Sequence, residues 1–93
     1  MKGIDIQEFY NELYYGCEIF FCLNATRYMV ESHTDNGNYC IILHQENNGN
    51  DEIIYNEKST NIDDVISHFM KSKNFDGKNI YGVEKEIEII DIY

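Results

Sequence analysis

Residues 17–57, CEIFFCLNATRYMVESHTDNGNYCIILHQENNGNDEIIYNE, decide the fold because they combine alternating apolar residues with strong turn signals. Asn36-Gly37 and Asn48-Gly49 suit two-residue hairpin turns, since both central residues of a type I′ turn need a positive φ. Asn24-Ala25 is a weaker candidate for another turn of this kind. Turns at these three positions divide the stretch into four strands and predict an antiparallel meander.

The turns also determine which residues pair between strands. The turn at Asn24-Ala25 places Val30 opposite Ile19, and the turn at Asn36-Gly37 places Val30 opposite Leu43. The turn at Asn48-Gly49 places Leu43 opposite Ile54. Successive side chains of a strand alternate between the two faces of a sheet. One face therefore collects a continuous apolar set, which is predicted to be the core face: Cys17, Ile19, Phe21, Tyr28, Val30, Tyr39, Ile41, Leu43 and Ile54.

The second face of the predicted sheet is mixed rather than polar. Its apolar members are Phe20, Cys22, Met29, Cys40, Ile42, Ile53 and Tyr55. Its polar members are Glu18, Arg27, Glu31, His33 and His44. A fully solvated face is expected to be more polar than this. An apolar strip flanked by acids is typical of a partner surface. The alternative is that the C-terminal segment or an oligomer mate covers the strip.

Two segments outside the meander have the apolar spacing of amphipathic helices. Residues 5–15 repeat apolar side chains every three or four positions, with Asp5 as the N-cap and Glu8 in capping-box position. Residues 61–72 have the same periodicity, and Asn61 is a suitable cap. Both segments are predicted to be helices that cover the core face.

The C-terminal part is predicted to add a short helical turn and a closing strand. Residues 78–85 suit the turn, and residues 86–93 alternate Ile with acids, which indicates a strand. The alternation slips at Ile89-Ile90, which predicts a β-bulge. The order is then α-β-β-β-β-α-β, and the fold class is an α+β two-layer sandwich with a mainly antiparallel sheet. A chain of 93 residues accommodates one domain, residues 1–93.

The composition is that of a folded, acidic protein. Seventeen Asp and Glu residues face seven Lys and Arg residues, and the net charge is -10. This charge repels phosphates and attracts basic surfaces, so we expect a basic protein surface as the partner and no direct binding of nucleic acid. The alternative is that the charge serves only solubility. No apolar run is long enough to span a bilayer, so no membrane is expected as a partner.

The cysteines and the first residues predict a cytoplasmic protein. Cys17, Cys22 and Cys40 form no paired framework, and residues 1–5 lack the apolar region of a signal peptide. Cys17 and Cys22 differ in parity, so they are expected on opposite faces of one strand. This placement favours buried packing over a shared metal.

No sequence motif indicates catalysis. The chain has no GxSxG, Walker, HExxH or CxxC motif, and a two-layer sandwich of this length has little room for a substrate pocket. His33 is predicted opposite Cys40, with His44 on the same face, but the spacings of known metal-ligand sets are absent. His68 follows Asp64 by four residues, which favours a surface contact between them. We therefore expect no enzyme activity, no metal and no cofactor.

The carboxy-terminal residues resemble a known type of protein. Phe75-Asp76-Gly77-Lys78 followed by Glu86-Ile87-Glu88-Ile89-Ile90 is similar to the end of short uncharacterised proteins of low-GC bacteria and their phages. The rest of the chain matches that type by layout alone, and the resemblance implies no catalytic residues. In size, charge and this kind of source, the chain is also similar to anti-CRISPR proteins and toxin-immunity proteins. Those proteins are commonly small acidic inhibitors that occlude a nuclease.

These observations predict a small acidic non-enzymatic inhibitor that binds a basic surface of a nucleic-acid-processing enzyme. The acids are expected to speed association and the apolar strip to supply affinity. The alternative is a self-associating structural or regulatory module that uses the second face as a homodimer interface. Three of the acids are expected to line one face of an edge strand, namely Glu84, Glu86 and Glu88. The residues expected to bind the partner are Asp51, Glu52, Glu84, Glu86, Glu88, Phe20, Met29, Ile42 and Tyr55.

Overall fold

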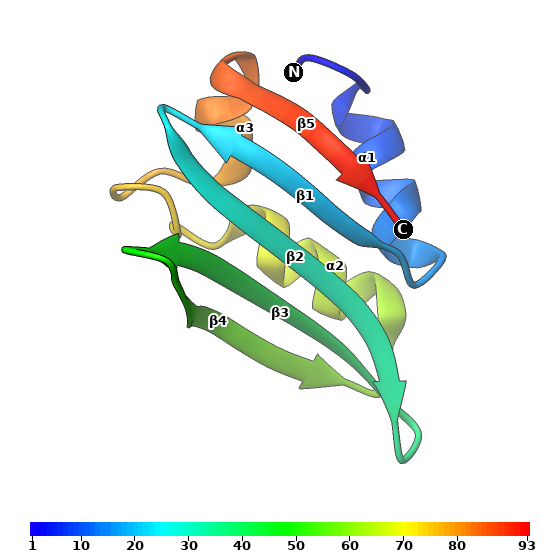
Figure 1. Cartoon of the computed structure of the whole chain (residues 1–93). Coiled ribbons are helices and arrows are strands. Elements are labelled where there is room, and N and C mark those ends of the chain that lie inside the picture. Colours follow the sequence, from blue (N-terminus) through cyan, green and yellow to red (C-terminus); the bar gives the residue numbers. More distant parts are fainter.

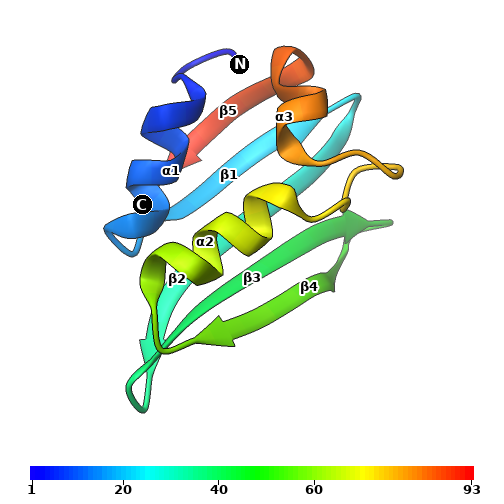
Figure 2. The same ribbon diagram turned by 180° about the vertical axis from the view of Figure 1, so that it is seen from behind.

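A computed structural model describes all 93 residues. One five-stranded sheet has the strand order β4-β3-β2-β1-β5, and the helices lie on one of its faces (Figures 1 and 2). All strand pairs in the sheet are antiparallel. The elements in chain order are α1 (Ile6–Tyr14), β1 (Glu18–Leu23), β2 (Thr26–Asp35), β3 (Asn38–Asn47), β4 (Asn50–Ser59), α2 (Ile62–Lys71), α3 (Ile80–Val83), the 3-10 helix η1 (Glu84–Glu86) and β5 (Ile87–Ile92). The predicted α+β sandwich and its order are confirmed, including the helical turn before the last strand.

Both long helices begin at the residues that the sequence indicates. Asp5 Oδ1 accepts a hydrogen bond from the Glu8 backbone N–H at 2.8 Å, and Asn61 Oδ1 accepts one from the Asp64 N–H at 3.1 Å. Each cap satisfies a backbone donor that the helix leaves free, which stabilises the helix by about 1 kcal/mol. The two helices bury their apolar sides against the sheet through Phe9, Leu13, Val65, Ile66, Phe69 and Met70.

The three hairpin turns are confirmed. Both central residues have positive φ at Asn24-Ala25 (49° and 68°), Asn36-Gly37 (49° and 81°) and Asn48-Gly49 (54° and 82°). The register follows from these turns over β1, β2 and β3, since Val30 pairs with both Ile19 and Leu43 as predicted.

Ala25 is the one turn residue whose side chain conflicts with its backbone, because its φ of 68° is unfavourable for a residue with a Cβ. Ala25→Gly is expected to raise the free energy of unfolding by about 0.5–1 kcal/mol, since the relief of strain exceeds the added flexibility of the unfolded chain. Gly37→Ala is the matched reverse change, because Gly37 has a φ of 81° and an added Cβ meets nothing within 4 Å. It is expected to cost about 1 kcal/mol. Urea unfolding measures both, and an Ala25→Gly protein of unchanged stability contradicts this account of the turn.

Two β-bulges change which side chains share a face. In the first, Phe20 pairs with Asp91 and Phe21 pairs with Ile89, so Ile90 is the extra residue of β5. This bulge lies where the slipped alternation of the sequence predicts it. The unpaired residue locally bends the strand without disturbing the burial of Ile87 at its start.

The second bulge was not expected, and it overturns part of the predicted register. His44 pairs with Ile53 but Leu43 pairs with Tyr55, so Ile54 is the extra residue of β4 and the predicted pairing of Leu43 with Ile54 is wrong. From Tyr55 onward, β4 has the opposite parity to that predicted. Tyr55 therefore lies on the core face, with its ring 5.4 Å from the ring of Phe69. Ile54 also packs against the core.

Tyr55 makes the stability sensitive to alkaline pH. Burial, and then a hydrogen bond from its hydroxyl to the Glu57 carboxylate, raise the pKa of Tyr55 far above its ordinary value of 10.0. Burial also raises the pKa of Tyr28. The protonated phenols are thus favoured in the folded state. Their contribution is complete below the unfolded pKa of about 10 and is lost as the pH rises through the higher folded values.

We therefore expect the free energy of unfolding to fall above about pH 10. Tyr55→Phe is expected to make this fall less steep, because Phe has no proton to lose. Tyr15→Phe serves as the control, since Tyr15 is 75% exposed and its replacement is expected to leave the slope unchanged. Urea unfolding at a series of alkaline pH values measures the slopes. Equal slopes for the Tyr55→Phe and wild-type proteins contradict the assignment to Tyr55.

Candidate functional site

One face of the sheet is covered by α1, α2 and α3, and the other is covered by nothing (Figures 1 and 2). We call the uncovered side the open face. The C-terminal strand β5 pairs with β1 at the end of the sheet and does not cross this face. The C-terminal strand therefore does not cover the apolar strip, and of the C-terminal segment only Tyr93 packs against Phe20.

Apolar side chains occupy the middle of the open face. Phe20 on β1 lies opposite Met29 on β2, and its ring contacts the ring of Tyr93 edge to face, with 5.6 Å between centroids. A shallow hollow of about 190 Å³ includes Phe20, Met29, His44 and Ile90 in its lining. Half of Ile90 and 56% of Ile53 are exposed. The apolar members of the open face are Phe20, Cys22, Met29, Cys40, Ile42, Ile53, Ile90 and Tyr93.

Acidic side chains surround this apolar centre. The strand register places seven carboxylates on the open face: Glu18, Glu31, Asp35, Glu46, Asp51, Glu88 and Asp91. It places three permanent cations there: Arg27, Lys58 and Lys2, which forms a β-bridge with Glu88 at the edge of β5. The ion pairs of the protein are three contacts between His and Glu, and no Lys or Arg takes part. The negative charge of the open face is therefore not neutralised by ion pairs with Lys or Arg of the same molecule.

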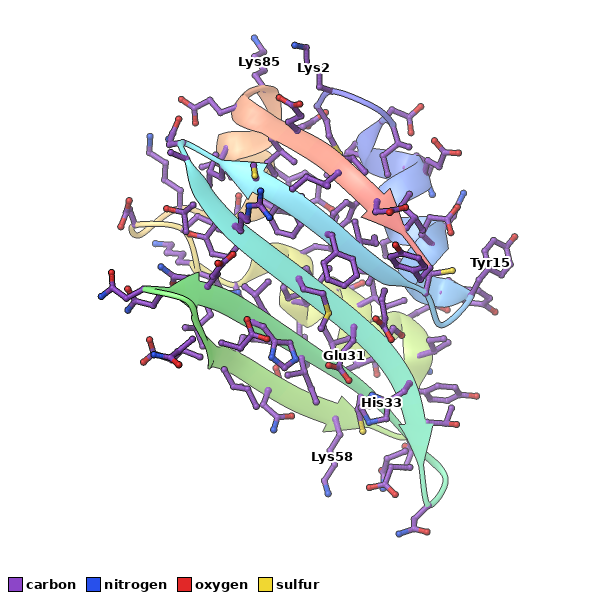
Figure 3. The ribbon with its side chains drawn as sticks, viewed as in Figure 1. Lys2, Tyr15, Glu31, His33, Lys58 and Lys85 are labelled. Carbon is purple, nitrogen blue, oxygen red and sulfur yellow. The ribbon has the colours of Figure 1, made fainter.

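A cluster of Glu31, His33 and His44 lies at the centre of the open face. His44 Nε2 is 2.6 Å from Glu31 Oε2, and His33 Nδ1 is 3.4 Å from Glu31 Oε1. Because an ionised carboxylate only accepts hydrogen bonds, Nε2 of His44 is the donor. Figure 3 shows Glu31 and His33 close together on this side of the sheet. His33 lies opposite Cys40, as predicted. The structure contains no group of three or more His, Cys, Asp or Glu side chains arranged to hold a metal ion.

The open face includes five of the nine residues predicted to bind a partner. These are Phe20, Met29, Ile42, Asp51 and Glu88. The sheet brings them together from all five strands, with Asp51 at the hairpin end of β4 and Glu88 on the opposite edge strand. The prediction of Glu88 on an edge strand is confirmed.

The other four predicted residues lie elsewhere. Tyr55 is on the core face because of the bulge in β4. Glu52 pairs with Gln45, which also places it on the side of the helices. Glu84 and Glu86 belong to η1, so the predicted row of three acids along one strand is wrong. The strand β5 begins only at Ile87, so Glu84 and Glu86 have helical backbone and only Glu88 has strand backbone. A spacing of two residues therefore does not place these three acids on one face.

Several residues of the open face were not among those predicted to bind. Glu31 and His44 were placed on this face by the register, but the contact between them depends on side-chain rotamers. Asp91 and Ile90 reach it through the bulge in β5. Alternation alone does not specify which face a residue occupies beyond a bulge. The predicted bulge at Ile89-Ile90 was the sequence signal that could have placed Asp91 on the open face.

Two other expectations concern His68 and the cysteines. His68 Nδ1 is 3.6 Å from Glu57 Oε1, so its contact reaches β4 instead of Asp64 on its own helix.

All three cysteines are free. Cys17 lies before β1, and burial beside Glu12 raises the pKa of its thiol. A raised pKa disfavours the reactive thiolate, so Cys17 is a poor nucleophile.

The chain has no match among known families or structures. No family model matches it, and neither does any curated protein or solved structure. None of its helices combines the length and apolar character needed to cross a membrane.

Proposed function

We propose that this chain is a non-enzymatic inhibitor that docks its open face on a basic surface of a partner protein. The observation that carries the proposal is the pairing of an uncovered apolar centre with a surrounding excess of carboxylates. Phe20, Met29 and Ile42 supply apolar area that a partner removes from water. Exposed apolar patches with polar rims are typical of protein interfaces.

The charge of the open face favours a basic partner over a second copy of the chain. In a symmetric dimer built on this face, its seven carboxylates meet seven others, with only Lys2, Arg27 and Lys58 of each copy to offset them. Like charges placed against each other at an interface oppose association. No Lys or Arg of this chain forms an ion pair with the carboxylates of the open face. A partner surface rich in Lys and Arg instead compensates their negative charge.

The partner class that this charge favours is a nucleic-acid-processing enzyme. Such enzymes bind phosphates with Lys and Arg, so their binding grooves attract an acidic protein. An acidic protein seated in the groove excludes the nucleic acid. Inhibition then needs no catalytic group and no cofactor in the inhibitor, and it takes place in the cytoplasm as an anti-CRISPR or immunity protein would act.

The test is capture of the partner with matched variants of the bait. Tagged wild-type protein, a Phe20→Ala/Met29→Ala variant and a Tyr14→Ala/Tyr15→Ala variant are each incubated with lysate of the cell that encodes the chain. The last variant removes exposed aromatic rings near the end of α1, outside the open face. We expect a nucleic-acid-processing enzyme that is retained by the wild type and by the Tyr variant, lost with the open-face variant, and released by salt. Salt-insensitive capture, or equal capture by all three baits, contradicts the proposal.

A further inference from the structure

Glu31 differs from the other six carboxylates of the open face in position and burial. It lies on β2, the middle strand of the sheet, opposite Glu18 on β1 and Ile42 on β3. Its side chain is only 28% exposed. The other six belong to exposed residues: Glu18, Asp35, Glu46, Asp51, Glu88 and Asp91. A partner that covers the apolar centre therefore removes the remaining water from Glu31.

Each carboxylate oxygen of Glu31 contacts one histidine and can still accept a further hydrogen bond. Oε2 accepts from His44 Nε2 at 2.6 Å, and Oε1 has a longer contact of 3.4 Å with His33 Nδ1. An ionised carboxylate has about four acceptor positions, two on each oxygen. Each oxygen therefore keeps one position for another donor. Since His44 is only 17% exposed, its ring also restricts the rotamers of Glu31.

We propose that Glu31 determines partner specificity by receiving an arginine side chain from the centre of the partner's basic surface. The inference rests on the proposed function, since docking is what covers Glu31. A buried carboxylate without a compensating donor or charge is strongly unfavourable. His44 gives Glu31 one hydrogen-bond donor, but no Lys or Arg of this chain pairs with Glu31, so a permanent compensating cation comes from the partner.

Arginine fits this position better than lysine. Its planar guanidinium presents two parallel N–H donors, which match one free position on each oxygen of a carboxylate. Phe20 lies opposite Met29, one step along the same face from Glu31. The aromatic ring of Phe20 offers a surface on which a guanidinium stacks, a contact that arginine makes more often than lysine.

The test compares hexa-arginine and hexa-lysine peptides as probes, because the two carry the same charge. Isothermal titration at low salt is expected to give about fivefold tighter binding of hexa-arginine to the wild-type protein. Glu31→Gln is expected to reduce this preference to about twofold or less. Glu88→Gln, which removes the same charge from an exposed position on the same face, is expected to weaken both peptides and leave the preference unchanged. Thermal unfolding checks that each variant is folded.

A second variant keeps the test decisive if Glu31→Gln does not fold. Phe20→Leu removes the ring but retains an apolar side chain, and it is expected to lower the affinity for hexa-arginine more than that for hexa-lysine. Equal binding of the two peptides by the wild-type protein, or a preference that survives both changes, overturns the role of Glu31 while leaving the proposed docking of the open face intact. If neither peptide shifts the methyl resonances of Met29 and Ile42, the proposed function fails as well.

Discussion

Phe21→Ala is expected to lower the free energy of unfolding by about 3–5 kcal/mol, the largest effect of any single change considered. Phe21 is 0% exposed and its ring contacts three others: Phe9 at 5.9 Å, Tyr28 at 5.3 Å and Phe75 at 6.1 Å between centroids. These rings belong to α1, β2 and the loop after α2, so removing Phe21 leaves a cavity where the helical layer meets the sheet. Urea unfolding measures the loss.

Phe20→Ala is the matched control because Phe20 is adjacent in sequence and points to the open face. It is expected to cost less than half as much stability as Phe21→Ala, since Phe20 is only half-buried. Its expected effect is on partner binding, which it weakens by roughly thirtyfold, as truncation of a central aromatic residue at an interface does. Equal losses of stability for the two variants contradict the assignment of the two faces.

Charge reversal on the open face is expected to slow partner association by about tenfold with little change in the dissociation rate. The variant is Glu18→Lys/Glu88→Lys, which changes two exposed acids of the open face. Stopped-flow or surface-plasmon measurements at several salt concentrations give both rates. The difference from wild type is expected to shrink as the salt rises, since salt screens interactions between exposed charges.

The control for charge reversal is Glu84→Lys/Glu86→Lys. It makes the same change in net charge at acids of η1, which the structure places before the strand that joins the open face. Association is expected to slow by only about twofold, through the change in total charge. If the two double variants slow association equally, total charge is responsible and the open face has no special role.

The sequence predicted the fold well because its local signals agree with one another. The dipeptides at the turns, the caps Asp5 and Asn61 and the two helical stripes are each satisfied by contacts within a few residues. Such short-range preferences are visible without knowledge of the rest of the structure. The confirmed register of β1, β2 and β3 follows from turn geometry together with alternation.

The candidate site was less predictable because it depends on backbone irregularities and side-chain rotamers. The bulge at Ile54 reverses the parity of β4 and moves Tyr55 from the predicted binding set to the core face. The run of apolar residues at Ile53-Ile54-Tyr55 is the same kind of slipped alternation as Ile89-Ile90, but no bulge was predicted from it. The contact of Glu31 with His44 joins diagonal positions on neighbouring strands, and only long side chains in suitable rotamers close that distance.

The central claim is that the open face, and not the helical layer, meets the partner. Its most direct test is methyl NMR of the Ile- and Met-labelled protein with and without the partner that the capture experiment identifies. The methyl groups of Met29, Ile42 and Ile53 report on the open face, and Ile4 and Ile62 report on partly buried positions beside the helical core. We predict that the partner shifts or broadens the first three resonances and leaves the last two unchanged. Shifts confined to Ile4 and Ile62 would contradict the account.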